Sequence, residues 1–269
     1  MLLCVDIGNS NINFGLFCGS CDDMVCCFSI SSAVKRTSDE YFLIINQMLS
    51  QFSVEPAPDS FCISSVVPTL TADVCGACER LCGCEPFIIS KGTKTGFPIK
   101  IDSQAQLGAD IVSNTAAAFK FVKPPFAVVD VGTATTVTAV DRDGNLIGAV
   151  IAPGANISLE ALKDSAALLT DVSLQKPDSV IGKNSQDSIR SGIFYGNVYM
   201  IDGFIRQIRS ELCEDGEKLA LIGTGGLSKV ILPHCRNKFE IIENLTLKGA
   251  ASLFYQNTAN RHHNYTKSV

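Results

Sequence analysis

The sequence contains no tryptophan and only three histidines among its 269 residues. No uninterrupted apolar run reaches the roughly 18 residues that a membrane-spanning helix requires, so we expect no contact with a membrane. Basic residues are not in excess, because 22 Lys and Arg stand against 27 Asp and Glu, giving a net charge of −5 and a pI near 5.2. This balance argues against a nucleic-acid-binding surface.

The first residues show no basic segment followed by a small-residue cleavage site, which predicts a cytoplasmic protein. Cysteine, in contrast, is abundant at 12 residues. Without an export signal, and with irregular spacing, these cysteines favour free thiols over a disulfide framework. The Cys75-x-x-Cys78 spacing leaves zinc as an alternative, although Cys82-x-Cys84 does not complete a zinc knuckle. Cys75, Cys78 and Cys82 also fit one helix face, where a free cysteine packs as a small apolar side chain.

The N-terminal stretch Leu2–Val5 is apolar and leads into Asp6-Ile7-Gly8-Asn9-Ser10-Asn11 before a second apolar run begins. This pattern predicts a strand, a tight turn and a second strand, with a carboxylate at the end of the first. Gly8 permits close approach of the backbone to a ligand. Such a turn can bind phosphate oxygens, while Asp6 can hold a cation or its waters. An ordinary hairpin turn with Asn and Ser side chains is the alternative interpretation.

A second copy of this pattern occupies Ala127–Val137, where Asp130-Val131-Gly132 again follows an apolar strand and precedes small hydroxyl residues. An internal repeat of this kind constrains the whole fold. We therefore predict an α/β protein of two ribonuclease-H-like lobes with an ATP cleft between them, similar to the actin, hexokinase and Hsp70 superfamily. The expected division is a first lobe over 1–122, a second lobe over 123–257 and a polar, frayed tail over 258–269.

Local signals place most of the other elements. Thr37 and Glu40 form a capping box that begins a helix, and Pro68 precedes the cysteine-bearing helix. Strands are predicted near 2–6, 12–18, 24–30, 60–67, 85–89, 128–131, 135–141, 146–151, 219–223 and 238–242. Further helices are predicted at 112–122, at 158–169, from the stretch 181–185 to about 212, from Ser228, and at 246–256.

Nine motifs follow one another in an order that resembles the type III pantothenate kinase family, and the resemblance covers residues 1 to about 255. They are Asp6–Asn11, Arg36–Tyr41, Ser64–Pro68, Gly108–Asp110, Asp130–Thr136, Ala152–Gly154, Ile181–Ser185, Ser191–Gly196 and Thr224–Gly226. The resemblance implies ATP-dependent phosphorylation of pantothenate to 4′-phosphopantothenate, the first step of coenzyme A biosynthesis. It also implies a homodimer.

The resemblance further implies roles for individual residues. Asp110 matches the catalytic base, and Asp130 matches the ligand of a monovalent cation, potassium or ammonium. A divalent ion such as magnesium accompanies the nucleotide. ATP contacts match Asp6, Ile7, Gly8, Asn9, Ser10, Asn11, Ile12, Asn13 and Thr133. Substrate contacts match Gly108, Ala109, Asp110, Ile111 and Ser185.

Two departures from the family pattern lie on the substrate side. Ile111 stands where the family has Arg, and Ile cannot supply a guanidinium that pairs with an anion or braces the base. The segment Ile101–Gln106 is also short and lacks the usual Tyr and Pro. An impaired nucleotide-binding paralogue with a regulatory role is therefore one alternative, and a kinase for another hydroxyl acceptor is a second. A simpler reading of Asp110 itself is a helix N-cap.

Overall fold

The computed structural model describes residues 1–53, 57–165, 172–214 and 216–265. The chain forms two compact units. Unit 1 comprises Met1–Phe97, Asp102–Lys120 and the chain from Leu245 onward, and unit 2 comprises Pro98–Ile101 and Phe121–Asn244. Among the described residues, no helix combines the length and the apolar character needed to cross a membrane.

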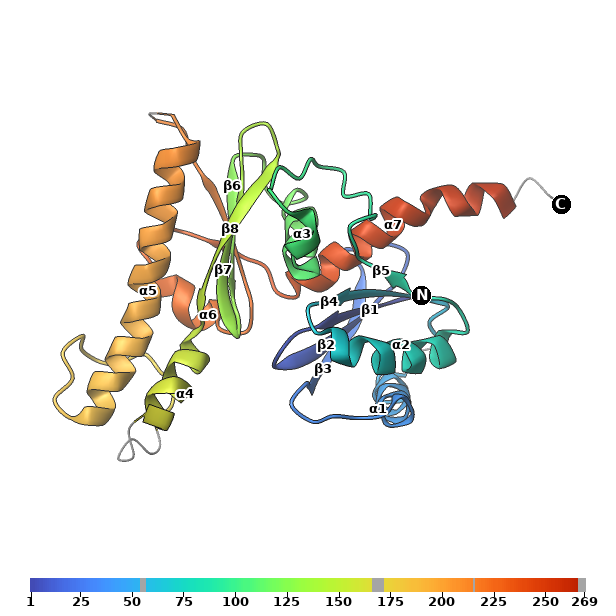
Figure 1. Ribbon diagram of the computed structural model, residues 1–269, viewed down its shortest axis with the longest axis horizontal. Coiled ribbons are helices and arrows are strands. Elements are labelled where there is room, and N and C mark those ends of the chain that lie inside the picture. The colour runs from blue at the N-terminus through green and yellow to red at the C-terminus, as the bar shows by residue number, and fades with distance from the viewer. Residues whose placement is uncertain (54–56, 166–171, 215, 266–269) are drawn as a thin grey trace. The chain divides into compact units, whose positions relative to one another are not determined.

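Unit 1 is built on a five-stranded mixed sheet of order β3-β2-β1-β4-β5 (Figure 1). Strand β1 pairs antiparallel with β2 and parallel with β4. The strands are β1 (Leu2–Ile7), β2 (Asn11–Phe17), β3 (Met24–Ser31), β4 (Ser60–Ser65) and β5 (Phe87–Ile88). The helices are α1 (Ser38–Gln51), α2 (Pro68–Cys82), the 3-10 turn η1 (Gln104–Gln106), α3 (Ala109–Ala118) and α7 (Leu245–Tyr265).

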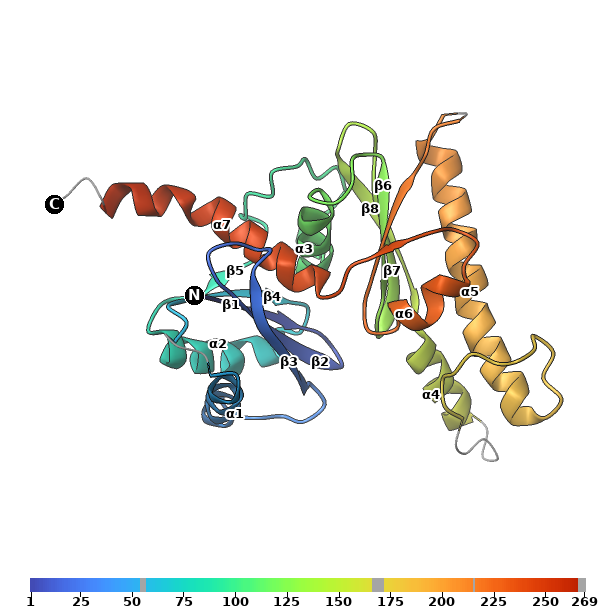
Figure 2. The same ribbon diagram turned by 180° about the vertical axis from the view of Figure 1, so that it is seen from behind.

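One face of this sheet packs against α1 and α2, which lie side by side (Figures 1 and 2). The predicted capping box is present at the start of α1, where Thr37 and Glu40 bond each other's backbone N–H groups. Cys75 and Cys78 on α2 are buried in the same core, and Cys82 packs against it. All twelve cysteines are free, and no group of three or more metal-ligating side chains occurs among the described residues.

The opposite face of the unit 1 sheet is covered by α7. The Cys62 Sγ lies 3.5 Å from the Ala250 carbonyl oxygen, so β4 and this helix are in direct contact. Helix α7 also crosses α3 closely, because a Cβ added at Gly249 would meet the Ser113 backbone. Small side chains on both helices permit this approach. The last helix of the chain therefore completes the core of the first unit.

Unit 2 repeats the architecture, with a sheet of order β10-β9-β6-β7-β8. Its strands are β6 (Phe126–Val131), β7 (Ala134–Val140), β8 (Leu146–Pro153), β9 (Ala220–Thr224) and β10 (Glu240–Ile241). Its helices are α4 (Ala155–Ser165), α5 (Ser185–Leu212), α6 (Ser228–Ile231) and the 3-10 turn η2 (Leu232–His234). Reading this order from β8 gives the sequence of unit 1, so β6 corresponds to β1 and β9 to β4. The predicted repeat and two-lobed α/β fold class are confirmed.

Three strands, β4, β5 and β10, are shorter than predicted, and three helices differ from the sequence-based prediction. Helix α3 spans Ala109–Ala118 rather than 112–122, and α4 spans Ala155–Ser165, while the predicted continuation over 166–169 lies outside the described residues. Helix α7 spans Leu245–Tyr265, whereas the predicted helix ends near 256. Because its first turns pack on unit 1, the helix extends beyond the segment that hydrophobic periodicity marks.

Candidate active site

The first acid-bearing turn lies at the end of β1 in unit 1. Asp6 stands opposite Asn13 on β2, and the Asn13 Nδ2 donates to the Asp6 Oδ2 at 3.3 Å. The Ser29 hydroxyl of β3 donates to the Asn13 Oδ1 at 2.7 Å, which fixes the orientation of the amide. A row of polar side chains across three strands thus positions one partly exposed carboxylate.

The turn itself is held by the backbone and by the residue after β3. The Gly8 N–H donates to the Asn11 carbonyl at 3.0 Å, and the Ser32 hydroxyl donates to the Gly8 carbonyl at 2.7 Å. Asn9, Ser10 and Asn11 are exposed, as a ligand-contacting turn requires. The side chains of the flanking Ile7 and Ile12 are fully buried in the unit 1 core. These two residues can therefore offer a nucleotide only their backbone groups.

Ser64 on β4 lies beside Asp6, because the two residues pair in register across the parallel strands. Its side chain is fully buried, and the hydroxyl has no hydrogen-bond partner within the described structure. A buried polar group without a partner is uncommon and costs stability. The neighbouring Val66 N–H donates to the Ile7 carbonyl at 3.0 Å, which joins the ends of both strands.

The Gly108–Ile111 segment begins α3 in the same unit. Gly108 is the N-cap, so the interpretation of Asp110 as the cap residue is wrong. A Cβ at Gly108 would meet the Asp110 carboxylate and would lie 3.5 Å from Val66 Cγ1. Only glycine therefore leaves room for the carboxylate beside the turn that follows β4.

The Asp110 side chain is half-buried. The Ile111 N–H donates to its Oδ1 at 2.8 Å. Burial raises the pKa of the carboxyl above the usual aspartate value, and this backbone N–H together with the residue's own N–H partly opposes the shift. A more basic carboxylate with an oriented oxygen is suited to accept a proton. The Ile111 side chain is buried.

The second acid-bearing turn, in unit 2, is shorter than the first. Val131 pairs with Thr135, leaving three residues in the turn, whereas Ile7 pairs with Ile12 and leaves four. The Gly132 N–H donates to the Ala134 carbonyl at 3.1 Å. Thr133 lies in this turn, and its carbonyl accepts from the Gly154 N–H at 3.2 Å.

Asp130 lies between this turn and the glycine-rich turn after β9. Thr224 pairs with Asp130 in register, and a Cβ at Gly225 would meet the Asp130 Oδ1. Gly225 has φ +91°, a conformation that glycine adopts without strain. The Asp130 carboxylate therefore lies against the backbone of this turn, and a carboxylate is an oxygen ligand that a cation can use.

Ser185, the remaining predicted substrate residue, is the first residue of α5 and is exposed. Asn184 caps this helix, accepting from the Asp187 N–H at 2.9 Å. Gly182 has no room for a side chain because the first turn of α5 packs on it. The segment around Ser185 is therefore held rigidly at one helix end.

Apart from Ser185 at the start of α5, the predicted residues lie together within each unit. Asp6, the turn at 8–11 and Gly108–Asp110 gather around the ends of β1 and β4, and Asp130 and Thr133 gather around the ends of β6 and β9. Two neighbours, Ser64 and Gly225, were recognised as parts of motifs but not as site residues. Their signal was the register of the parallel strands, which places each beside an acid-bearing residue.

Known proteins of the same architecture define the class. The chain is similar to the activator of 2-hydroxyisocaproyl-CoA dehydratase from Clostridium difficile, solved with bound ADPNP (TM-score 0.51, 10% identity, 100% and 98% of the two chains covered). It is also similar to the ethanolamine utilization protein EutJ from Carboxydothermus hydrogenoformans (TM-score 0.53, 12% identity, 93% and 89% covered). The fold is the actin- and hexokinase-like ATPase fold.

Sequence comparison narrows the class to one family. The family model described as type III pantothenate kinase matches residues 2–207. A type III pantothenate kinase from Pelobacter propionicus is 38% identical over 258 residues, which cover 96% of this chain and 100% of the relative. The chain belongs to the type III pantothenate kinase family.

Proposed function

We propose that this protein transfers the γ-phosphoryl group of ATP to the primary hydroxyl of pantothenate, giving 4′-phosphopantothenate and ADP in the first step of coenzyme A biosynthesis. The observation that carries the proposal is the 38% identity over nearly the whole chain to a type III pantothenate kinase. The candidate-site geometry supports it, since Asp6 and Asp130 each precede a tight turn at the end of a strand and Asp110 lies in the first turn of α3.

Asp110 acts as the general base in this proposal. Its Oδ accepts the proton of the pantothenate hydroxyl as that oxygen attacks the γ-phosphorus and the bond to the ADP oxygen breaks. Burial raises the pKa of this carboxyl, which makes it a stronger base than an exposed aspartate. The hydrogen bond from the Ile111 N–H to Oδ1 fixes its orientation.

The Asp6 turn binds the ATP phosphates. The exposed Asn9, Ser10 and Asn11 offer side-chain and backbone donors, while Ile7, Gly8, Ile12 and Asn13 shape the turn. The Thr133 hydroxyl donates a hydrogen bond to a phosphate oxygen of ATP. Asp6 holds the nucleotide's divalent ion or its waters, and that ion neutralises the charge of the phosphates.

Gly108, Ala109, Ile111 and Ser185 contact pantothenate in this proposal. Gly108 carries no side chain and so leaves room for the Asp110 carboxylate that accepts the proton of the acceptor. Ser185 supplies a hydroxyl from the start of α5. Ile111 replaces the charged contact of the family pattern with an apolar one, so binding of the pantothenate carboxylate depends on other donors.

The active form is proposed to be a cytoplasmic homodimer. Unit 2 exposes large apolar side chains on β8, on α4 and in the segment before α5, and exposed apolar side chains are used by protein interfaces. They are Ile151, Ile157, Leu162 and Ile181, which are 67%, 40%, 42% and 79% exposed. Twelve free thiols fit a reducing compartment. One chain has a mass of 28.7 kDa, and sedimentation velocity should give twice that mass. A monomer at all concentrations would contradict the dimer.

Incubation of the purified protein with pantothenate, ATP, magnesium and potassium tests the activity, with the product identified by mass spectrometry. We expect 4′-phosphopantothenate and an equal amount of ADP. ATP binding without product would favour the regulatory paralogue, and product with another hydroxyl compound alone would favour a different acceptor. The full-length similarity to kinases and the retained carboxylates do not favour either alternative.

Asp130 is proposed to hold the monovalent cation, which supplies positive charge beside the phosphates. Replacing potassium with sodium should therefore lower kcat, because a smaller ion fits an oxygen cage of fixed size poorly. Asp130→Asn should raise the potassium concentration needed for half-maximal rate at least about tenfold. The measurement is initial rate against potassium at constant ionic strength. Rates that do not depend on the cation would contradict this role.

A further inference from the structure

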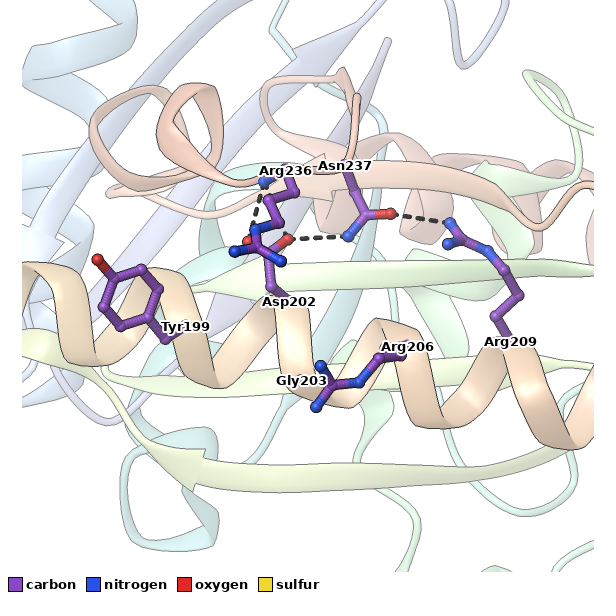
Figure 3. A pocket seen from close by; sticks show the side chains of 7 residues that line it. All are labelled: Tyr199, Asp202, Gly203, Arg206, Arg209, Arg236 and Asn237. Carbon is purple, nitrogen blue, oxygen red and sulfur yellow. Dashed lines mark hydrogen bonds between the residues drawn. The ribbon is translucent and has the colours of Figure 1, made fainter.

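A pocket of about 410 Å³ lies in unit 2, at a place that none of the predicted site residues lines. It is formed by the second half of α5 and the segment after Cys235 (Figure 3). The lining residues are Tyr199, Asp202, Gly203, Arg206, Arg209, Arg236 and Asn237. Its volume is within the range of small-molecule sites. Along α5, Arg206 lies 21 residues beyond Ser185, or roughly 32 Å at the helical rise.

The lining is strongly cationic in a chain whose net charge is −5. Three arginines face one carboxylate, that of Asp202. That carboxylate already accepts from the Arg236 backbone N–H at 2.9 Å and from the Asn237 Nδ2 at 2.8 Å. Asp202 therefore orders the backbone of the loop and does not pair with an arginine side chain.

The guanidinium groups of Arg206 and Arg236 form no ion pair with any described residue, and both side chains are exposed. Two other arginines of the unit, in contrast, form ion pairs with carboxylates. Arg142 pairs with Glu214 and Glu217, and Arg190 pairs with Asp187. Arg209 is bound through the Asn237 Oδ1 at 2.8 Å, which aligns it with the loop. The pocket thus concentrates guanidinium donors that the protein itself does not neutralise.

The pocket also has an aromatic wall and an open floor. The Tyr199 ring is 57% exposed and stacks on Tyr195, with centroids 5.8 Å apart, so its outer face is available and its position is fixed. Gly203 has no atom within 4 Å of an added Cβ, so the helix surface between Tyr199 and Arg206 is hollow. A fixed aromatic face beside several guanidiniums suits a planar base joined to phosphates.

We propose that this pocket binds a phosphorylated nucleoside, with its phosphates on Arg206, Arg209 and Arg236 and its base on Tyr199. Guanidinium groups bind phosphate through paired, charge-assisted hydrogen bonds, and an aromatic ring binds a base by stacking. The site lies entirely within unit 2. It does not depend on pantothenate phosphorylation and would remain if that assignment failed.

Equilibrium binding of ADP to the full chain, by calorimetry at low salt, tests the proposal. We expect two ADP molecules per chain for the unaltered protein and one for Arg206→Ala/Arg236→Ala. Loss of two guanidinium contacts should weaken the pocket by a factor on the order of 100 or more. Arg80→Ala/Arg142→Ala removes the same charge outside the pocket and should retain both sites. An ADP stoichiometry that the Arg206→Ala/Arg236→Ala change leaves unaltered, whether one or two per chain, would overturn the proposal. A single site that this change abolishes would instead retain the pocket and count against the nucleotide site of the proposed kinase.

Pyrophosphate separates recognition of the phosphates from recognition of the base. Tyr199→Ala should weaken ADP binding at the second site by about tenfold and leave pyrophosphate binding unchanged, because only the base contacts the ring. Equal effects on both ligands, or none on ADP, would overturn the assignment of a nucleoside. An acidic polypeptide that binds the pocket while both ADP and pyrophosphate fail would overturn the proposal in favour of a protein partner.

Discussion

Asp110→Asn should lower kcat by a factor of about 10² to 10⁴ while the dissociation constant of ATP stays nearly the same. The amide keeps the shape of the carboxylate but cannot accept the hydroxyl proton of the acceptor. ATP affinity is preserved because the nucleotide is proposed to bind through the Asp6 turn and Thr133. Steady-state kinetics with calorimetric titration of ATP measures both quantities. Asp73→Asn on α2 makes the same change away from the site and should have full activity.

The pH dependence gives this prediction a second test. Because burial raises the pKa of the Asp110 carboxyl, protonation should begin to remove the base at a higher pH than for an ordinary aspartate. The acidic limb of kcat/KM should therefore lie above the usual aspartate range, with the rate falling as pH decreases through that pKa. The residual rate of Asp110→Asn should lack this limb. An unchanged limb in the variant would assign the base to another residue.

Gly249→Ala should destabilise the protein by about 3 kcal/mol or more, at the upper end of the effects of overpacking. A Cβ at this position meets the backbone of Ser113, and a main chain cannot move aside by changing rotamer as a side chain can. Either α7 must separate from α3 or both helices must shift. Urea unfolding followed by circular dichroism measures the change in the transition midpoint.

Gly196→Ala on α5 is the matched control for this steric effect. Gly196 is also in a helix, but no atom lies within 4 Å of an added Cβ. The substitution should therefore stabilise the protein by up to about 1 kcal/mol, because alanine loses less backbone entropy in a helix. A similar loss of stability in both variants would show that the close contact of α3 and α7 is not the cause.

Local sequence signals predicted the parts of the fold that neighbouring residues determine. The Asp-x-Gly turns gave both central hairpins, Thr37 and Glu40 gave the start of α1, and apolar spacing gave the full length of α5. These features depend on strand period, turn chemistry and capping, which act over a few residues. The cysteine-bearing helix was also interpreted correctly as core, because its spacing fits one helix face.

Contacts between segments that are distant in the sequence could not be predicted from these local signals. Alanines and a glycine in α3 and α7 indicate close packing, but periodicity cannot tell which helix a small-residue face will meet. The cationic pocket was missed for the same reason, since Arg206 and Arg236 approach only when the segment after η2 folds back on α5. The N-cap of α3 was misplaced because Gly108 has no side chain that signals a cap.

The return of α7 to unit 1 has a consequence for biosynthesis. A chain emerges from the ribosome with its N-terminus first, so strands β1 to β5 are exposed early. The helix that covers Cys62 and Gly15 on this sheet is α7, which is synthesised after all of them. Unit 2 ends at Asn244 and has all its parts before α7 is translated. We expect the unit encoded second to reach its native state first, with the nascent N-terminal sheet exposed to chaperones in the interval.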